Sequence, residues 1–455
     1  MKFTFIFLLT ISWIFHLNAD ETTTYKKMVS LCDTLTKNHP RVKSSQAILN
    51  SSEDQVKVAL GAYYPNLNLD YDQTFKKLDN HASSNPNQET RSFGASVSQL
   101  IYDFGKTNLD IQVALGTVKQ NKLSLENTKQ AILLEGLELC LDYSSTWQQV
   151  KFETQSASNF KQQMDLENIK VKKGQGYSTD VLQAEAQWLG AKNRKLQLQA
   201  ALKRLESSFI SLFGDSSSID SLSGELIRKN NLEYPKNLMQ SEKPSVPSSN
   251  LNIELVSKQT TTLQNNTDDL IKNNPRILSL KIAIENQELR KKSLVKNRFR
   301  PELTGSLASE VNQYDRSANP FQRETTAAIQ LSFPLNLGFT ALDEVSALSK
   351  RIFSLEQDYE DEKRQLISSL ETHLINWETA NESALLLKRQ AEISRKFLEG
   401  AEKERTMGRR SLIDVINGEL ILIRAKSSLE QAEIQALRSY FRYLNTIGNL
   451  QTNKL

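Results

Sequence analysis

Two short stretches of the sequence share one spacing of residues: GQGYSTDVLQAE at Gly174–Glu185 and GRRSLIDVINGE at Gly408–Glu419. Each begins with glycine, includes a hydroxyl residue and reaches Asp-Val six and seven positions after the glycine. The two glycines, at 174 and 408, are 234 positions apart. This interval is too long for a solenoid, whose repeats are about 20–50 residues long, so the motif indicates a duplicated domain.

Further landmarks recur in the same order at almost the same interval. NHPR at Asn38–Arg41 is matched by NNPR at Asn273–Arg276, and SLFG ending at Gly214 is matched by NTIG ending at Gly448. Chance does not readily produce an ordered set of this kind, so we predict that one unit is written twice. The predicted parts are a first repeat over 20–214, a Ser/Asn/Pro-rich linker over 215–266, a second repeat over 267–448 and a tail over 449–455.

The N-terminus has the pattern of a secretory signal peptide. Lys2 precedes the apolar run FTFIFLLTISWIF, and a small residue, Ala19, ends the segment. The alternative is a membrane anchor, but the run is shorter than the about 20 residues that cross a bilayer. We therefore predict a signal peptide at 1–19 and an exported mature protein.

The bulk composition favours long helices and gives no sign of nucleic-acid binding. The chain has only 16 Gly and 10 Pro among 455 residues, and its net charge is +4. It has two cysteines, Cys32 and Cys140. Export permits a disulfide between them, and the alternative is two buried, small apolar side chains.

Each repeat contains one predicted β-hairpin. After Pro65 and again after Pro301 the hydrophobic period becomes two, as in the alternation of Leu67, Leu69 and Tyr71 with polar residues. The predicted strands are about ten residues long, which suits a tilted transmembrane strand. The same alternation also fits a soluble sheet over a core, and the strands alone do not separate the two.

Long helices with a seven-residue period follow each hairpin, and such a period is typical of coiled coils. The outgoing helix, from Lys106 to about Asn168, measures ~94 Å, and the helices Pro40–Tyr64 and Asp180–Phe213 together measure ~89 Å. Each repeat is therefore expected to place one long helix beside two shorter ones, with the Gly…Asp-Val motif at the turn. The repeating positions are Val118, Leu125, Ile132 and Leu139, then Leu182, Leu189 and Leu196.

Four strands in one chain cannot close a useful barrel, and open strand edges are not tolerated in lipid. The sequence therefore predicts an oligomer, and three copies give twelve strands. The predicted fold class is mainly α with a pair of transmembrane β-hairpins. The duplicated unit forms a trimeric 12-stranded β-barrel on a long α-helical coiled-coil barrel.

The whole pattern resembles the TolC family of outer-membrane efflux and type I secretion channels. The resemblance is carried by the signal peptide, the duplicated unit, the NNP helix start, the Pro-x-Leu strand entry, QLIYDFG at Gln99–Gly105 and Gly-x-x-x-x-x-Asp-Val. It covers essentially the whole mature chain. It implies a homotrimer in the bacterial outer membrane that extends into the periplasm, with no catalysis and no cofactor.

The resemblance also implies partners. These are a periplasmic adaptor (membrane fusion) protein and an inner-membrane ABC or RND transporter, which supplies the energy for export. Drug efflux and type I protein secretion are not separated by the sequence. The alternative function is that of a soluble exported coiled-coil structural protein with no transport role.

In that family the periplasmic turns close the tunnel, and the resemblance implies five gate positions here. Asp414 matches a gate aspartate, and Asp180 is its counterpart, which partners the basic position of Arg410. Asn417 stands where a second gate aspartate is expected, and Arg405 stands where an aromatic residue is expected, so the sequence departs from the family at both positions. The alternative role for Asp180 and Asp414 is helix N-capping.

The remaining candidate positions are turns and aromatics. Gly174 and Gly408 are predicted tip turns. Four aromatic residues near strand ends are predicted to form an interfacial girdle, with a soluble core as the alternative. They are Tyr63, Tyr64, Tyr102 and Phe104.

No enzyme signature supports catalysis. The sequence has no His-Glu-x-x-His and no Gly-x-Ser-x-Gly, and FGKT at Phe104–Thr107 lacks a phosphate loop because Leu100 replaces its first glycine. His39, His81 and His373 are scattered, so no metal site is expected.

Overall fold

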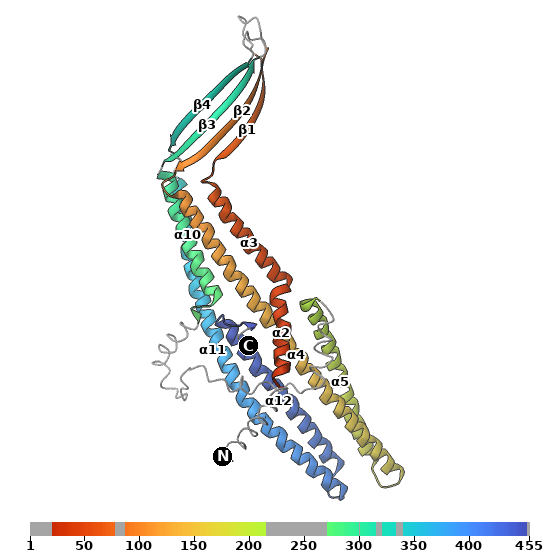
Figure 1. Ribbon diagram of the computed structural model, residues 1–455. Helices are drawn as coiled ribbons and strands as arrows, with labels where there is room; N and C mark the ends of the chain where they lie inside the picture. The colour runs from red at the N-terminus through yellow and green to blue at the C-terminus, as the bar shows by residue number, and fades with distance from the viewer. Residues whose placement is uncertain are drawn as a thin grey trace, which may run out of the picture. The chain divides into compact units, whose positions relative to one another are not determined.

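The computed structural model describes residues 21–77, 87–214, 271–299, 301–314, 321–333 and 340–452 (Figure 1). The predicted signal peptide at 1–19, the whole linker at 215–266, His81 and the last three residues of the tail lie outside the described residues. In chain order the elements are α2 Glu21–Asn38, α3 Pro40–Gly61, β1 Asn66–Lys77, β2 Asn87–Tyr102, α4 Lys106–Lys172, α5 Ser178–Phe213, α10 Pro275–Phe299, β3 Glu302–Tyr314, β4 Phe321–Ser332, α11 Thr340–Thr406 and α12 Leu412–Thr446.

The chain divides into two compact units, and each unit combines segments from both sequence repeats. The first unit consists of 1–43, 126–274 and 363–455, and the second of 44–125 and 275–362. The second unit holds all four strands, while the first holds both helical hairpin turns. Among the described helices, none contains a stretch that is apolar enough to cross a membrane.

Local chemistry fixes several helix starts. α3 begins at Pro40 as predicted, and the Arg41 N–H donates to Nδ1 of His39 at 3.2 Å, which makes His39 the cap. α4 is capped by Asp103, whose two carboxylate oxygens accept from the N–H groups of Gly105 (3.0 Å) and Thr107 (2.7 Å). Both helix starts are therefore stabilised by a side chain within a few residues of the N–H groups that it caps.

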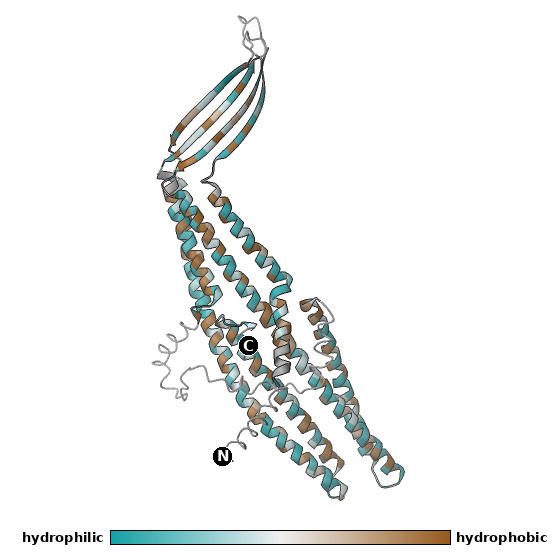
Figure 2. Ribbon diagram, in the orientation of Figure 1, coloured by the Kyte–Doolittle hydropathy of each residue, from teal (hydrophilic) through white to brown (hydrophobic). Residues whose placement is uncertain are grey.

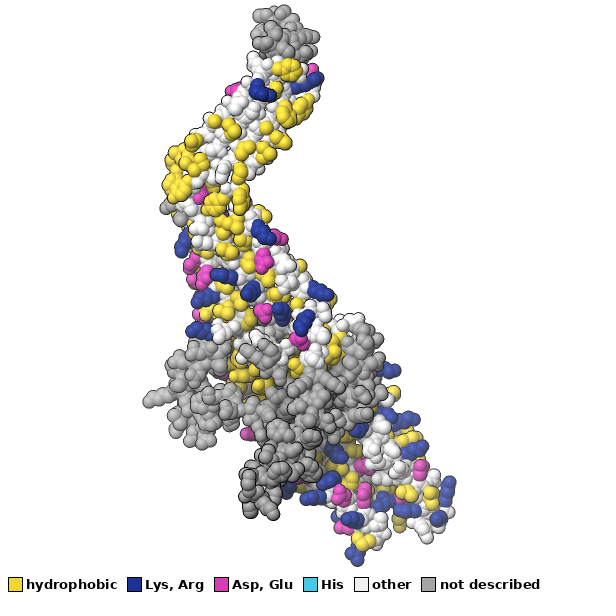
Figure 3. All heavy atoms as spheres, viewed as in Figure 1, with side chains coloured by type: hydrophobic (Ala, Val, Ile, Leu, Met, Phe, Trp, Pro, Cys, Tyr) yellow, Lys and Arg dark blue, Asp and Glu magenta, His cyan; other side chains and the backbone are white. Residues whose placement is uncertain are grey.

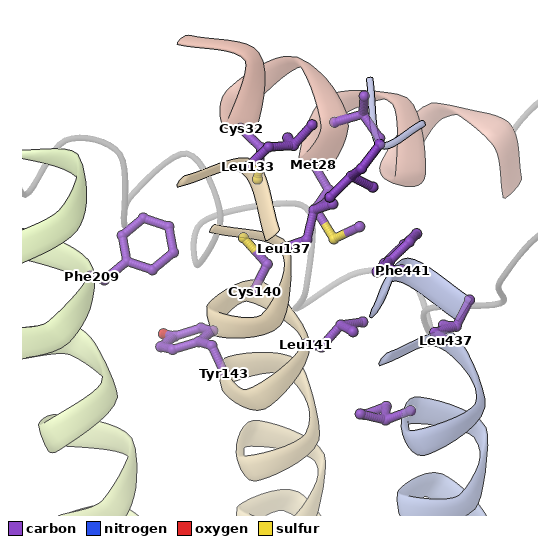
Figure 4. Packing of buried hydrophobic residues seen from close by; sticks show 13 residues of the cluster. Met28, Cys32, Leu133, Leu137, Cys140, Leu141, Tyr143, Phe209, Leu437 and Phe441 are labelled. Atoms are coloured by element: carbon purple, nitrogen blue, oxygen red, sulfur yellow. The ribbon is translucent and has the colours of Figure 1, made fainter. Parts of the chain in front are cut away.

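Helix α2 precedes the first predicted helix and was not predicted. Its buried residues Met28, Val29, Cys32 and Leu35 fall at i, i+1, i+4 and i+7, which is one face of a helix. Met28, Val29 and Cys32 pack into the core of the first unit with residues from α4, α5 and α12 (Figure 4). The apolar period therefore continues into the residues that follow the signal peptide.

The four strands form one antiparallel sheet in the order β1-β2-β3-β4. Both predicted hairpins are confirmed: β1 pairs with β2, and β3 pairs with β4. The two repeats are joined by a third ladder, in which β2 pairs with β3 and Val97 lies opposite Leu307. Strands β1 and β4 are therefore the edges of the sheet.

One face of this sheet is an apolar band, and no other part of the described chain covers it. Rows such as Leu67, Val97, Leu307 and Ala327 lie side by side across all four strands. Most of the large apolar side chains of this face are exposed, from Val97 at 38% to Ile329 at 77%, while Leu303 and Val311 are partly buried. Figure 2 shows apolar and polar residues alternating along the strands, and Figure 3 shows hydrophobic side chains gathered over them.

On α4 the predicted seven-residue row is buried within the chain, whereas on α5 it is not. Leu125 and Ile132 of the predicted row on α4 are buried. On α5, Leu182, Leu189 and Leu196 are 50–65% exposed, whereas Ala184 and Ala191, at the same spacing, are fully buried against α4 and α12. The small residues let the helices approach closely, so the leucine row faces away from the chain's own core.

Candidate functional site at the helical hairpin turns

The two hairpin turns have the same backbone structure. Gly174 and Gly408 adopt φ values of 74° and 73°, in the left-handed region that glycine favours. Each glycine N–H donates at 2.9 Å to the carbonyl three residues earlier, and the next N–H donates at 2.9 Å to the carbonyl five residues before it. This is a Schellman motif. Gly174 and Gly408 therefore lie in the turns that end α4 and α11.

Asp414 lies in the first turn of α12 and takes part in a reciprocal cap. The N-cap is Ser411, whose Oγ accepts from the Asp414 N–H at 3.3 Å and donates to Asp414 Oδ2 at 2.9 Å. The N-cap is therefore Ser411 and not Asp414, which lies three residues after it. Asn417, three residues further on, is exposed.

Asp180 occupies the equivalent place in α5 without the same cap. The N-cap there is Tyr177, which has no capping side-chain hydrogen bond, so Asp180 acts on the helix only through its position in the first turn. Asp180 is partly exposed, and within the described part of the chain its carboxylate has no ion-pair partner. Its predicted partner lies elsewhere in this chain.

Arg410 is bound within its own hairpin. Its Nε donates to Oε2 of Glu404 at 2.6 Å, and its guanidinium lies 5.3 Å from the ring centroid of Phe397. The single chain therefore does not join Arg410 to Asp180. The predicted pairing of Asp180 with Arg410 at the two hairpin tips stays a prediction.

Arg405 forms an ion pair that connects the two hairpins. Its guanidinium binds Oε1 of Glu167 on α4, and Lys170 Nζ lies 3.0 Å from the same oxygen. The side chains of Glu167 and Arg405 are 4% and 20% exposed. A pair this buried is costly to break, because the remaining charge is left without a partner. Arg405 is thus a polar link between α11 and α4 in place of the expected aromatic contact.

Glu419 is a second link between the hairpins that the sequence did not reveal. This buried carboxylate on α12 accepts from Asn159 Nδ2 at 2.5 Å and from Gln163 Nε2 at 3.2 Å, both on α4. Burial raises the pKa of Glu419, Glu402 adds to the shift, and the two amide donors oppose it. Its counterpart in the first repeat, Glu185, is only partly buried. The presence of glutamate at both positions therefore did not indicate that Glu419 would be buried.

The register of the sheet creates a row of acidic side chains on the face opposite the apolar band. Asp70 lies opposite Gly94, Gly94 opposite Glu310, and Glu310 opposite Glu324. The three carboxylates are exposed. They come from three strands, so their alignment depends on strand pairing and is not visible in the sequence.

The four predicted interfacial aromatics lie at one end of the β1–β2 pair. Tyr63 and Tyr64 precede β1, while Tyr102 and Phe104 follow the paired segment of β2. The rings of Tyr102 and Phe104 are 4.7 Å apart between centroids, and the three tyrosines are exposed. The position suits a girdle, and the girdle role stays a prediction.

No group of three or more His, Cys, Asp or Glu side chains that could hold a metal ion occurs among the described residues. His39 caps α3 through its Nδ1. His373 lies on α11, and burial together with nearby Arg442 lowers its pKa. Among the described residues, the two histidines thus lie in helical contacts and not in a cluster of metal-ligating side chains.

Comparison with known proteins gives one family. A model of the family described as "Outer membrane efflux protein" matches residues 31–215 and 266–449. The outer membrane efflux protein BepC of Brucella suis biovar 1 (strain 1330) is 22% identical over 429 residues, which cover 92% of this chain and 84% of that protein.

Solved structures share the fold at low sequence identity. A membrane protein from Pseudomonas aeruginosa aligns with a TM-score of 0.76 and 13% identity, covering 92% of this chain and 93% of that chain. The Campylobacter jejuni CmeC outer membrane channel aligns with a TM-score of 0.74 and 12% identity, covering 95% and 88%. The outer membrane protein VceC of Vibrio cholerae gives 0.72 and 12%, covering 93% and 97%.

Proposed function

Because the chain belongs to the outer membrane efflux protein family, we propose that three copies of it form one gated export conduit. The chain is an outer-membrane efflux channel that works with the other components of a tripartite pump. Its family consists of channels and is not a family of enzymes. The finer proposals below concern the assembly, the gate and the partners.

The single observation that carries the trimer proposal is the uncovered four-stranded sheet. It is one layer thick, its apolar side chains are exposed, and its edges are β1 and β4. An apolar face with open edges is stable in lipid only if the edges are paired. Pairing β4 of one chain with β1 of the next, three times, closes a twelve-stranded barrel.

The apolar band has the length that a bilayer requires. On β3 it extends from Leu303 to Val311, nine residues, and at its far end the next row contains Arg91 on β2. A tilted strand crosses the hydrocarbon core with about 9–11 residues. We infer that the apolar band faces lipid and that the acidic row faces the lumen.

The leucine row on α5 supports the same assembly. Three leucines at a spacing of seven remain largely exposed on a helix whose opposite side is already packed. In a coiled coil such a row is buried against a neighbouring helix. We infer that the neighbour belongs to the adjacent chain of the trimer.

The hairpin turns are the proposed gate. Glu167–Arg405 and the Glu419 cluster hold α4 to the second hairpin within each chain. Among the described residues Asp180 has no ion-pair partner, so we infer that its carboxylate contacts Arg410 of a neighbouring chain, and three copies of Asp414 would face one another around the axis. Opening then requires these polar links to be broken, and a docked partner can supply the free energy.

The proposed partners are a periplasmic adaptor protein and an inner-membrane transporter of the ABC or RND class. The channel itself is a passive conduit, so the transporter must provide the energy. Small molecules and proteins both remain candidate cargo. The alternative role of a soluble exported spacer is disfavoured by the family assignment and by the uncovered apolar sheet.

The proposal is tested by fractionation, cross-linking and single-channel recording. The protein should sediment with outer membranes, require detergent for extraction and cross-link as a trimer. In planar bilayers, Arg405→Ala should raise the conductance severalfold, because the ion pair from α11 to Glu167 is lost and Glu167 keeps only Lys170 of its own helix, so the hairpins separate. Arg395→Ala is the matched control, since Arg395 is an exposed α11 arginine that only faces Glu399, 3.9 Å away.

Two results would separate the parts of the proposal. A stable monomer inserted in lipid would overturn the trimer. Unchanged conductance in both Arg405→Ala and Glu167→Gln would remove the gate assignment while leaving the channel intact.

A further inference from the structure

Two thiols meet inside the core of the first unit. Cys32 on α2 and Cys140 on α4 are 0% and 2% exposed and belong to one hydrophobic cluster. Figure 4 shows both sulfur atoms pointing into the space between the two helices. Both cysteines are free thiols in the structure.

The packing of α2 on α4 brings these sulfurs together. Gly136 lies one turn before Cys140, and a Cβ at Gly136 would be 3.3 Å from Cys32 Sγ and 2.7 Å from Leu35 Cδ1. The missing side chain therefore lets α2 approach α4 closely. The Cys32 thiol hydrogen-bonds with Cys140, and this contact and burial raise the pKa of Cys32 well above its usual range.

We propose that Cys32 and Cys140 are joined by a disulfide in the mature, exported protein. The proposal rests on export to an oxidising compartment, where disulfides form and persist, and not on the gate. Each thiol loses its hydrogen as the S–S bond forms. The two electrons and two protons pass to the disulfide of an exported dithiol oxidase, which becomes a dithiol.

The chemistry places the reaction before the core closes. Thiolate is the reacting species, and it is disfavoured once both sulfurs are buried. One cysteine attacks the oxidase disulfide while the chain is still open, and the other resolves the mixed disulfide. After folding, burial protects the bond from reductants.

The bond would close a loop from residue 32 to residue 140, which contains the whole β1–β2 hairpin. A cross-link over so long a loop mainly restricts the unfolded chain. α2 is otherwise attached through its apolar face and polar contacts such as Asp33 Oδ1 with Thr452 Oγ1 at 2.7 Å. The disulfide therefore fixes the first helix of the mature chain.

The test counts free thiols in the full chain. The protein is expressed with its own leader, and free thiols in isolated outer membranes are blocked with N-ethylmaleimide under denaturing conditions. Reduction and labelling with a polyethylene-glycol maleimide follow. A two-label mass shift that requires the reductant supports the disulfide. No shift after reduction means that both thiols were free, which overturns the proposal.

Single variants provide the controls, because the assay reads denatured protein and does not depend on folding. Cys32→Ser and Cys140→Ser should each lose the reductant-dependent shift. Expression in a host without its dithiol oxidase should leave both thiols free in the wild type. A band of two disulfide-linked chains on a non-reducing gel, in place of the internal bond, would also contradict the proposal.

Discussion

At the scale of single residues, glycine at the hairpin turns is required by backbone conformation and not by space. Gly174 and Gly408 have positive φ, and a Cβ at either position would meet no atom within 4 Å. Alanine in that conformation costs about 1–2 kcal/mol. We expect Gly174→Ala and Gly408→Ala each to lower the free energy of unfolding by about that amount, measured by circular dichroism in detergent.

The same substitution at Gly400 is the matched control. Gly400 lies inside α11 with a negative φ and open space around its Cα. Alanine there should raise the stability by about 0.5–1 kcal/mol, because it is the better helix former. Equal effects at Gly400 and Gly408 would contradict the role assigned to the turn conformation.

Glu430 should make stability depend on pH. Burial raises its pKa to about 7, and Glu433 adds to the shift. Between its ordinary pKa of 4.5 and about 7, the folded chain keeps a proton that the unfolded chain has released. The contribution of Glu430 to the free energy of unfolding is therefore greatest below pH 4.5. It falls as the pH rises from 4.5 to about 7 and is lost at higher pH.

Glu430→Gln should remove this dependence. At pH 8 the variant should be more stable than the wild type by about 1–3 kcal/mol, allowing for partial exposure. The difference should vanish below pH 4.5, and thermal unfolding at several pH values measures it. The exposed Glu356→Gln is the control and should show no such trend.

The caps could be predicted from the sequence, but the buried acids could not. His39 and Asp103 act on backbone N–H groups within a few residues, so the local sequence contains all the information. Glu167 and Glu419 look like ordinary surface acids in a polar helix. Their burial depends on a neighbouring helix that is more than two hundred residues away in the chain.

At the scale of elements, the sequence identifies the period of each segment but does not show what each face contacts. The alternation of apolar and polar residues predicted both hairpins. The pairing of β2 with β3, in contrast, brings together residues that are far apart in the chain, and no local sequence pattern predicts it. On α5 the seven-residue spacing of the leucines is present, but alanines fill the seam within the chain and the leucines are exposed. A row of large apolar residues indicates that a helix packs against another helix. It does not indicate whether that second helix belongs to the same chain.

The exposed leucines of α5 should be needed for assembly and not for folding of the chain. Leu189→Glu with Leu196→Glu places two charges in the proposed interchain seam, so we expect the trimer to be lost on cross-linking while helix content is kept. Gln197→Glu, an exposed change a quarter turn away, is the control. Retention of the full trimer in the leucine variant would contradict the proposed seam.

The two faces of the sheet should differ in their tolerance of charge. Leu69→Lys and Leu307→Lys place lysine on the apolar band, which costs about 2–4 kcal/mol at mid-depth in lipid. Ser96→Lys lies on the opposite face and should insert normally. Heat-modifiable mobility of outer-membrane fractions measures insertion, and equal tolerance on both faces would exclude a transmembrane sheet.

At the scale of the whole molecule, the acidic row should set the ion preference of the lumen. Three chains would place nine carboxylates, from Asp70, Glu310 and Glu324, at one level of the pore. Rings of carboxylates favour cations. Glu310→Gln with Glu324→Gln should shift the reversal potential toward anions under a salt gradient in planar bilayers. Glu89→Gln on the opposite face should leave that potential unchanged.

The ladder between β2 and β3 has a consequence for the ancestry of the chain. It joins the second strand of the first repeat to the first strand of the second repeat with the same antiparallel pairing that each hairpin uses internally. A trimer closed by β4 and β1 would thus contain six near-equivalent hairpins around its axis. An ancestor half as long, holding a single repeat, could have formed the same ring from six identical subunits. Fusion of two copies then allowed them to diverge, so that the buried Glu419 and the half-exposed Glu185 now differ at equivalent positions and reduce sixfold symmetry to threefold.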